Sequence, residues 1–328
     1  MRIGVKEQMN QRSDLAMVHP RPVAVLYLIL VGFIFMAGCD NAQQEHESAS
    51  EPTSGVVASN YAVWYFASTL GGEEIEVVFP APDSVDPSYW QPREKDVREM
   101  QQAKLVALNG AGYEHWLPTV TLVERRVVET AQPFRTQWIE IETEVTHTHG
   151  PEGEHSHTGW ADHTWLDPAL AIQQVDALAE AMVNAFPEHE TRIKSRQQAL
   201  KDSLAQWGKE IEDKLGVYQG RPLLTSHPIY QYFGRCIGMP LTSVVWEPRE
   251  TPDAAEREEF ESLLKKTPAS VMLWEAKPTQ PTLDYLASQG VKAVVFDPCS
   301  QRPASGNYFD QMRANLNRLV EALESEVP

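Results

Sequence analysis

Apolar residues recur along the first half of the chain with two different periods. Short runs rich in valine and isoleucine indicate buried strands, and apolar positions three or four residues apart indicate helices. The two patterns take turns, with strands predicted at 55–59, 74–79 and 105–108 and helices at 61–70 and 93–103. This alternation is typical of a parallel α/β sheet, in which ligands bind beyond the carboxyl ends of the strands.

The second half contains a long helical stretch and then repeats the α/β rhythm. Helical spacing extends through 168–215, with a break near Pro187. Further strands are predicted at 222–225, 243–246, 270–274 and 294–296, with helices at 230–237, 253–266, 282–289 and 307–326. We therefore predict an α/β fold of two lobes, 55–167 and 216–328, with mainly parallel sheets. The long bridging helix segment, 168–215, joins them, and the site lies in the interlobe cleft.

The N-terminal segment resembles a bacterial lipoprotein leader. Arg12 and Arg21 precede an apolar run at 23–37, which is short for a membrane span. The run ends in Met-Ala-Gly-Cys at 36–39. We expect a signal peptide over 1–38 and a lipid on the sulfur of Cys39. The alternative is an uncleaved amphipathic anchor.

The residues around this leader refine the expected location. A start at Met17 would give a leader of more usual length. Residues 39–54 are polar and predict a disordered tether. Asp40 resembles the inner-membrane retention signal of some Gram-negative lipoproteins. We therefore expect an extracytoplasmic protein, lipid-anchored on the periplasmic side and favouring the inner membrane.

The charge of the chain restricts its partners. The formal net charge is −18, and the chain without residues 1–38 keeps 24 basic and 44 acidic residues. An acidic surface argues against binding to nucleic acid or to an anionic membrane through a basic patch. It suits the accumulation of cations, although many proteins are acidic without that role.

Two cysteines remain once Cys39 is assigned to lipidation. Cys236 and Cys299 would lie in an oxidising compartment, where disulfides persist. A bridge needs Cα atoms within about 7 Å, which sequence alone does not establish. A Cys236–Cys299 disulfide and two free thiols both stay open.

Histidines are concentrated ahead of the helical stretch. His147, His149, His155 and His157 alternate with small and polar residues, so we predict a mobile metal-collecting loop at 146–158. His163 follows, beside Trp and Leu residues that can pack and an Asp-Pro pair that suits a helix start. Imidazole is a common ligand of transition metals, so His163 is a candidate metal ligand rather than a polar core residue.

Further candidate ligands follow the strands of the second lobe. Four predicted strands end at His227, Glu247, Glu275 and Asp297, which places these side chains on one edge. Two imidazoles and a carboxylate suit Zn²⁺, so we predict His163, His227 and Asp297 as ligands. Glu247 and Glu275 are expected as additional ligands or as residues that hydrogen-bond the ligands. Ser88 and Gln91, in the proline-rich loop of the first lobe, are further candidates.

The glycines at 110 and 112 follow the third strand. A Gly-x-Gly pair without a third glycine or a Lys-Ser/Thr is weak evidence for a phosphate site. We predict a tight turn at 109–114 without a ligand.

Five motifs stand out along the chain: Val85-Asp86-Pro87 with Pro92, residues 105–110, residues 162–168, Ser226-His227-Pro228 and Phe296-Asp297-Pro298. Together they resemble the periplasmic metal-binding components of zinc and manganese ABC importers, the cluster A-I family. The resemblance covers Gly55 to the C-terminus. It implies two α/β lobes, one ion in the cleft, an ABC permease as partner and no enzymatic activity. A His-rich loop before the second ligand is also frequent in this family.

The resemblance fails at one of the four family ligands. The family pattern Asp-Pro-His-x-x-Glu-Pro reads Asp86-Pro87-Ser88-Tyr89-Trp90-Gln91-Pro92 in this chain. A neutral hydroxyl is a poor ligand for Zn²⁺. We therefore expect His163, His227 and Asp297 to bind Zn²⁺, more weakly or with different selectivity than a four-ligand member. Two histidines favour Zn²⁺ over Mn²⁺ or another divalent ion.

Three other functions stay open at this point. A zinc-dependent hydrolase would also need three ligands and an open position, with Glu247 or Glu275 as base. Against it, the chain has no His-Glu-x-x-His motif. A metal sensor or buffer lipoprotein, and a metal-free adhesin-like lipoprotein, are the remaining alternatives. We expect the chain to act as a monomer.

Overall fold

The computed structural model describes residues 54–149 and 153–325. The expected signal peptide, the expected lipid attachment at Cys39 and nearly all of the expected tether lie outside these ranges. Within them, each helix is too short or too polar to cross a membrane.

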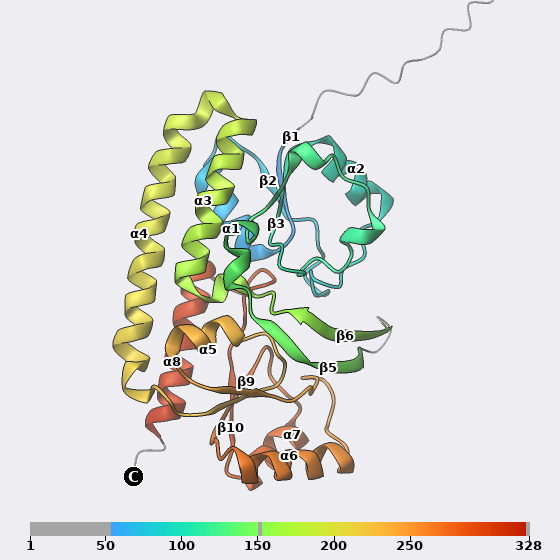
Figure 1. The fold of residues 1–328 in the computed structure, drawn as a ribbon, viewed down its shortest axis with the longest axis vertical. Helices are drawn as coiled ribbons and strands as arrows, with labels where there is room; N and C mark the ends of the chain where they lie inside the picture. The colour runs from blue at the N-terminus through green and yellow to red at the C-terminus, as the bar shows by residue number, and fades with distance from the viewer. Residues whose placement is uncertain (1–53, 150–152, 326–328) are drawn as a thin grey trace, which may run out of the picture. The chain divides into compact units, whose positions relative to one another are not determined.

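The first sheet contains four parallel strands in the order β2-β1-β3-β4 (Figure 1). The strands are β1 Ser54–Ala58, β2 Val77–Val78, β3 Ala103–Leu108 and β4 Val127–Glu129, with helices α1 Tyr61–Gly71 and α2 Glu94–Gln102. The side chain of Asn60 caps α1 by accepting from the N–H of Val63 at 2.8 Å. The helix ends before Gly72, which has a φ of 60° that glycine adopts without strain. The predicted alternation of strand and helix is confirmed, although β2 is shorter than 74–79.

The second sheet also contains four parallel strands, in the order β10-β9-β7-β8. The strands are β7 Leu223–Thr225, β8 Leu241–Ser243, β9 Val271–Trp274 and β10 Lys292–Val295. The helices are α5 Gln231–Ile237, α6 Ala254–Lys266, α7 Gln280–Ser288 and α8 Tyr308–Glu324. Strand β8 begins earlier than the predicted 243–246, because the carbonyl of Pro240 already accepts from the N–H of Leu223 at 2.9 Å.

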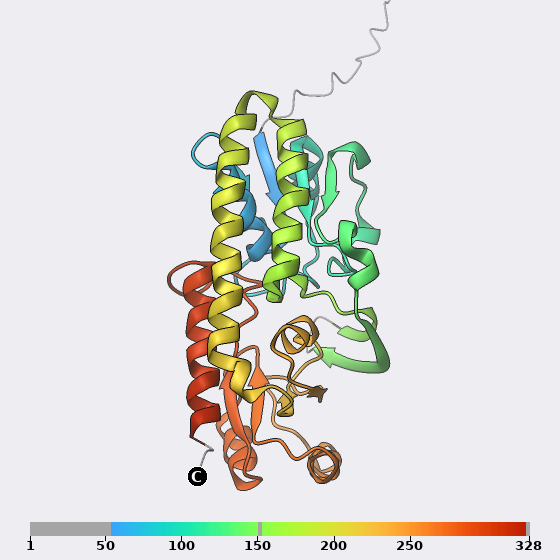
Figure 2. The same ribbon diagram turned by 60° about the vertical axis from the view of Figure 1, so that its left-hand side comes forward.

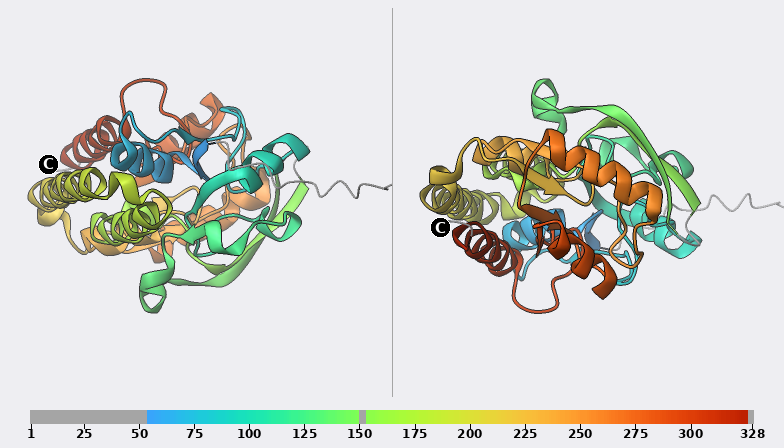
Figure 3. Two further views of the ribbon diagram at one scale, coloured as in Figure 1. Left: turned by 90° about the horizontal axis from the view of Figure 1, so that it is seen from above. Right: turned by 90° about the horizontal axis from the view of Figure 1, so that it is seen from below.

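Two long helices connect the two sheets. Helix α3 spans Pro168–Ala185 and helix α4 spans Glu190–Leu215, and the two helices pack side by side (Figures 2 and 3). Asp167 caps α3 by accepting from the N–H of Ala169 at 2.9 Å, with Pro168 at the first helical position, as the Asp-Pro pair predicted. Helix α4 contacts α1 beside the first sheet and α5 and α8 beside the second. The predicted α/β class with a bridging helical segment is confirmed.

An antiparallel hairpin and several short turns complete the described chain. The hairpin pairs β5 Glu140–His149 with β6 Gly153–Trp160. The 3₁₀ turns are η1 Leu117–Thr119, η2 Glu124–Arg126, η3 Gln132–Gln137, η5 Thr164–Leu166, η6 Pro187–His189 and η7 Gly216–Tyr218. The turn η5 matters most for the site, because it directly follows His163.

The largest apolar cluster is continuous from one sheet to the other. It joins residues of β1 and β3 to the inner faces of α3, α4 and α8 and to β7 and β9. Trp165 and Tyr308, both fully buried, lie at this junction, and the hydroxyl of Tyr308 donates to the carbonyl of Trp165 at 2.9 Å. The carboxyl ends of the two sheets are therefore held close together by shared packing.

Candidate metal centre

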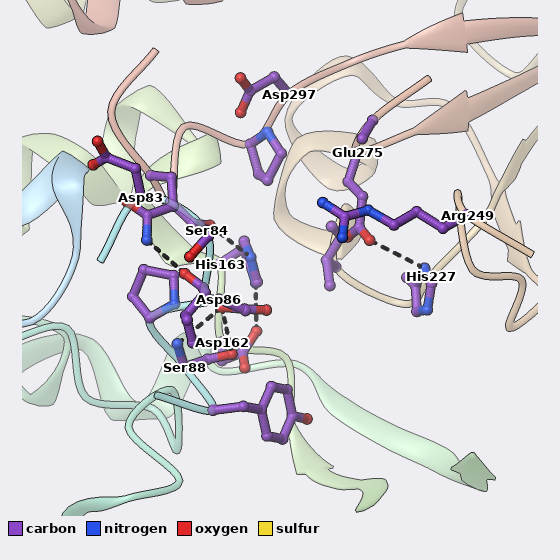
Figure 4. A pocket seen from close by; sticks show the side chains of 18 residues that line it. Asp83, Ser84, Asp86, Ser88, Asp162, His163, His227, Arg249, Glu275 and Asp297 are labelled. Carbon is purple, nitrogen blue, oxygen red and sulfur yellow. Dashed lines mark hydrogen bonds and ion pairs between the residues drawn. The ribbon is translucent and has the colours of Figure 1, made fainter. Parts of the chain in front are cut away.

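A cavity of about 310 Å³ lies at the carboxyl ends of the strands (Figure 4). Its walls come from the loop after β2, the turn after β6 and the segments that follow β7, β8, β9 and β10. Among the residues predicted for the site, Ser88, His163, His227, Glu275 and Asp297 line it. The structure thus brings candidates from both halves of the chain to one cavity.

His163 is held rigidly on the side of the first sheet. The ring is 6% exposed and lies against Trp165 and Tyr113, with ring centroids 4.7 and 5.5 Å away. Nδ1 lies 2.6 Å from the carboxylate of Asp162, and Nε2 lies 3.2 Å from the hydroxyl of Ser300. The side chain of Asn109 fixes the backbone nearby by donating to the carbonyl of Asp162 at 2.8 Å.

His227 occupies the opposite wall, directly after β7. The hydroxyl of Thr225 donates to the backbone carbonyl of His227 at 2.8 Å, and the ring is 3% exposed. Nε2 lies 2.9 Å from Glu247 Oε1, and Nδ1 lies 3.9 Å from Glu275 Oε1. Burial alone would lower the pKa of His227, but the charges of Glu275 and Glu247 outweigh it and raise that pKa.

The strand order explains why these two glutamates surround His227. Strand β7 lies between β8 and β9, and Glu247 and Glu275 follow those two neighbours. Neighbouring strands are about 4.8 Å apart, so residues beyond their ends meet. Among the described residues, His227, Glu247 and Glu275 form a group whose ligand atoms all lie within 4.8 Å of one another. This donor set, one imidazole and two carboxylates, suits a divalent cation.

Asp297 lines the same cavity but stands apart from this group. It follows β10, which is two strands away from β7. One carboxylate oxygen accepts from the N–H of Cys299 at 2.7 Å, and Figure 4 shows the carboxylate pointing away from His227 and Glu275. Burial raises the pKa of Asp297, and the N–H of Cys299 opposes this rise. His163 and Asp297 are outside the His227 group, so the predicted ligand set stays a prediction.

The two candidates from the proline-rich loop occupy different places. Ser88 is buried at the cavity wall, where its hydroxyl and its N–H both donate to Oδ1 of Asp86, at 2.8 and 2.9 Å. This local turn already uses the hydroxyl. Gln91 is exposed and is not among the residues that line the cavity. Of the two, only Ser88 reaches the candidate centre.

The segment predicted as a mobile histidine loop has a regular backbone on both sides of residues 150–152. The strands β5 and β6 pair in antiparallel register, with His147 opposite His155 and His157 opposite Val145. Valine and threonine at alternate positions favour strands, which the histidine pattern alone obscured. The metal-collecting role of His147, His149, His155 and His157 stays a prediction, because the structure describes only the backbone of these residues.

The Cys236–Cys299 bridge is wrong for this structure, in which both thiols are free. Cys236 lies on α5 beside Ile211 and Leu215 of α4. Cys299 is buried after β10, next to Asp297. The two cysteines follow different strands and pack in different surroundings, so the chain offers no geometry for a bridge.

The glycine turn after β3 binds an anion of the chain itself. The N–H groups of Asn109 and Gly110 donate to the carboxylate of Glu114 at 2.7 and 3.1 Å, and the hydroxyl of Ser59 donates to it at 2.6 Å. Gly110 has a φ of 78°, which makes the close approach feasible. Burial raises the pKa of Glu114 to about 7, despite these donors. This is consistent with the predicted tight turn and assigns its hydrogen-bond donors to Glu114.

Most residues that line the cavity were not predicted for the site, among them the charged residues Asp86, Asp162 and Arg249. Asp86 and Asp162 were quoted only as parts of motifs, and Arg249 was not considered. Asp86 helps to raise the pKa values of His227 and Glu275, so its charge reaches the opposite wall. Arg249 lies at the rim and is the cationic side chain nearest to Glu275 in Figure 4. Because Asp162 is next to His163 in the sequence, it could have been predicted for the site. No sequence feature indicated Arg249.

The matching family and two similar proteins are all named for metal binding or zinc uptake. The family described as the periplasmic zinc-uptake complex component A matches residues 56–322. The chain is 22% identical over 306 residues to the zinc-binding lipoprotein AdcA of Streptococcus pneumoniae, covering 90% of this chain and 60% of AdcA. It is 24% identical over 309 residues to a putative metal-binding protein of Treponema pallidum, covering 91% and 96% of the two chains. The chain thus spans 60% of the length of the first relative but nearly all of the second.

Solved structures support the same fold. The Zn(II)-bound AdcA of Streptococcus pneumoniae superposes with a TM-score of 0.69 at 20% identity, covering 84% of this chain and 59% of AdcA. The metal-dependent lipoprotein YcdH of Bacillus subtilis gives 0.68 at 20% identity, covering 82% and 98%. At these identities the likeness concerns the arrangement of sheets and helices.

Proposed function

Because the chain belongs to the family of periplasmic components of zinc-uptake complexes, we propose that it binds Zn²⁺ outside the cytoplasm and delivers the ion to an ABC importer. The ion is the cargo, and the membrane permease of the importer is the partner. One observation carries the proposal: His163 and His227, which follow strands of different sheets, line one cavity rich in carboxylates. Imidazole and carboxylate together are suitable ligands for Zn²⁺.

Within this proposal, His163, His227 and Asp297 are the ligands predicted from the sequence. Ser88 occupies the position of a fourth, histidine ligand, and its hydroxyl already donates to Asp86. We therefore propose weaker binding than in a family member with four ligands. Two histidines favour Zn²⁺ over Mn²⁺, which prefers more oxygen ligands.

The same proposal includes the cellular location of the protein and a role for its histidine hairpin. A lipid on Cys39 would hold the monomer at the periplasmic side of the membrane, and the histidine hairpin would collect ions at lower affinity. A hydrolase is disfavoured, because the family and the relatives are named for metal binding and uptake. The sensor or buffer alternative differs only in lacking delivery, so transport must be measured as well as binding.

Calorimetric titration of residues 40–328 with Zn²⁺ tests the proposal. We expect one tight site, which His227→Ala weakens by more than about 100-fold because a buried ligand is lost. His189→Ala is the matched control, since His189 immediately precedes α4 and is not among the residues that line the cavity. Transport into cells that lack their own zinc-uptake component should depend on the wild-type chain. Absence of Zn²⁺ binding, or equal binding by His227→Ala, would contradict the proposal.

A further inference from the structure

Two carboxylates contact the two different nitrogens of the His227 ring. Glu247 lies 2.9 Å from Nε2, within hydrogen-bond distance, and Glu275 lies 3.9 Å from Nδ1. We propose that His227 binds Zn²⁺ through Nδ1, that Glu275 binds the same ion, and that Glu247 is a positioning residue that holds the ring through Nε2. This inference rests on the proposed function and names a carboxylate ligand beyond the sequence-predicted set.

The position of Glu247 favours a supporting role. Glu247 is not among the residues lining the 310 Å³ cavity, but it lines a separate cavity of about 200 Å³ together with Trp246 and Thr251. His227 lines the main cavity, whereas Glu247, which contacts its Nε2, does not. An imidazole N–H that donates to a carboxylate fixes the tautomer, so that the opposite nitrogen carries the lone pair. Here the opposite nitrogen is Nδ1.

The position of Glu275 favours direct binding. Its side chain lines the main cavity, with 32% of its surface exposed, and lies on the Nδ1 side of His227. A separation of 3.9 Å is longer than a hydrogen bond. Two ligand atoms of a tetrahedral zinc ion, each about 2.0–2.2 Å from the metal, lie about 3.3–3.6 Å apart, so Glu275 Oε1 would need to approach Nδ1 by only a few tenths of an ångström. An ion placed between Nδ1 and the carboxylate would bring both within bonding distance with little movement.

The charge of the cluster favours a cation over a simple ion pair. Two carboxylates surround one imidazole, and the guanidinium of Arg249 beside Glu275 offsets one of their charges (Figure 4). The carboxylates of Asp86 and Asp162 line the same cavity and keep the surroundings negative even when His227 is protonated. Buried charges require compensation, and a divalent ion supplies it where one imidazolium does not. Glu275 then adds a carboxylate ligand beside His227.

Magnetic resonance on the wild-type protein tests which nitrogen binds the ion. The protein with isotopically labelled histidine is loaded with NMR-active Cd²⁺ as a probe for Zn²⁺. We expect a scalar coupling between cadmium and Nδ1 of His227, and a proton retained on Nε2. Coupling to Nε2 instead would overturn the inference while leaving the proposed function intact. Lack of any Cd²⁺ or Zn²⁺ binding would overturn both.

Calorimetry with Zn²⁺ separates the two glutamates. Glu275→Gln keeps the size of the side chain but removes the charge, and we expect it to weaken binding by more than about 100-fold. Glu247→Ala should weaken binding by about 10- to 100-fold, the range for residues that support a metal ligand. Glu247→Gln keeps an acceptor for Nε2, so its affinity should stay within about threefold of wild type, with cadmium still coupled to Nδ1.

A matched control and a folding check complete the design. Glu259 is an exposed glutamate of α6, so Glu259→Gln changes the net charge equally without touching the cavity. Thermal unfolding of each metal-free variant shows whether the fold is retained. If Glu275→Gln binds Zn²⁺ as tightly as Glu259→Gln does, Glu275 is not a ligand. If Glu247→Gln loses as much affinity as Glu247→Ala, Glu247 is itself a ligand and the assignment is wrong.

Discussion

His163 and His227 line one cavity, but carboxylates contact opposite nitrogens of their rings. His163 has Asp162, its neighbour in the chain, at Nδ1, and the hydroxyl of Ser300 near Nε2. His227 has Glu247 at Nε2, and this glutamate follows a different strand. The acceptor that holds a histidine decides which nitrogen is available to an ion. Asp162, close in the sequence, holds Nδ1 of His163 and so orients Nε2 towards an ion. Glu247, distant in the sequence, holds Nε2 of His227 and so orients Nδ1 towards an ion.

The same contrast extends to the other carboxylates of the two halves. In the first half, Asp86 accepts from Ser88 two residues away, and Glu114 accepts from Asn109 and Gly110 of its own turn and also from the more distant Ser59. In the second half, Glu247 and Glu275 meet only because β8 and β9 flank β7. The first wall is thus organised mainly by turns and the second by the order of strands.

The largest expected effect concerns the local anion site of the first half. Burial raises the pKa of Glu114 from its ordinary value of 4.5 to about 7, so the folded protein holds this proton more tightly than the unfolded chain. The contribution of Glu114 to the free energy of unfolding is full below pH 4.5 and falls as the pH rises to about 7. The loss between pH 5 and 8 is roughly 3 kcal/mol.

Urea unfolding at several pH values measures this effect. The comparison is between the wild type and Glu114→Gln, because other groups titrate equally in both proteins. The wild type should lose stability relative to the variant as the pH rises. Parallel pH profiles for the two proteins would show that the turn binds Glu114 without raising its pKa.

A smaller effect is expected at the acceptor of His163. Asp162→Ala removes the partner of Nδ1 and should weaken Zn²⁺ binding by about 10- to 100-fold, as for a residue that supports a metal ligand. Asp162→Asn retains an oxygen acceptor and should bind within about threefold of the wild type, since the ring stays oriented. Titration calorimetry measures both affinities. A loss of similar size in Asp162→Asn would indicate that the charge of Asp162, rather than its hydrogen bond, acts on the ion.

The smallest effect is expected from a histidine at position 88, where the resemblance to the family predicts a histidine ligand. Ser88→His adds an imidazole at the wall of the cavity and should tighten Zn²⁺ binding by about tenfold, close to 1.4 kcal/mol. The gain is limited because Ser88 is buried and its hydroxyl already donates to Asp86, so the loop must adjust. Competition with a chelator of known affinity gives the measurement. Unchanged affinity would mean that position 88 does not reach the ion.

Much of the fold follows from local patterns, and so does part of the site. The alternation of strands and helices, the Asp167 cap with Pro168 and the placement of His163 all depend on residues close together in the sequence. The shared edge that carries His227, Glu247, Glu275 and Asp297 was also predicted, because parallel strands end on the same side.

The order of the strands along that edge could not be predicted from the sequence. Strand β10 lies outside β9, so Asp297 is separated from His227 whereas Glu275 is next to it. The prediction of a loop at 146–158 was wrong for most of the segment, because the valine and threonine residues of β5 favour a paired strand. The prediction of a Cys236–Cys299 disulfide was also wrong. The distance between these two cysteines depends on the order of all the strands, which local sequence patterns do not give.

The packing of α4 limits how the protein can exchange its ion with solvent. One continuous helix of 26 residues contacts α1 near the first sheet and α8 near the second. A wide hinge rotation would break contacts along one end of this helix, including the ion pair of Arg313 with Glu210 at 2.8 Å. We therefore expect ion exchange through rearrangement of rim side chains such as Arg249, with the two sheets keeping their separation.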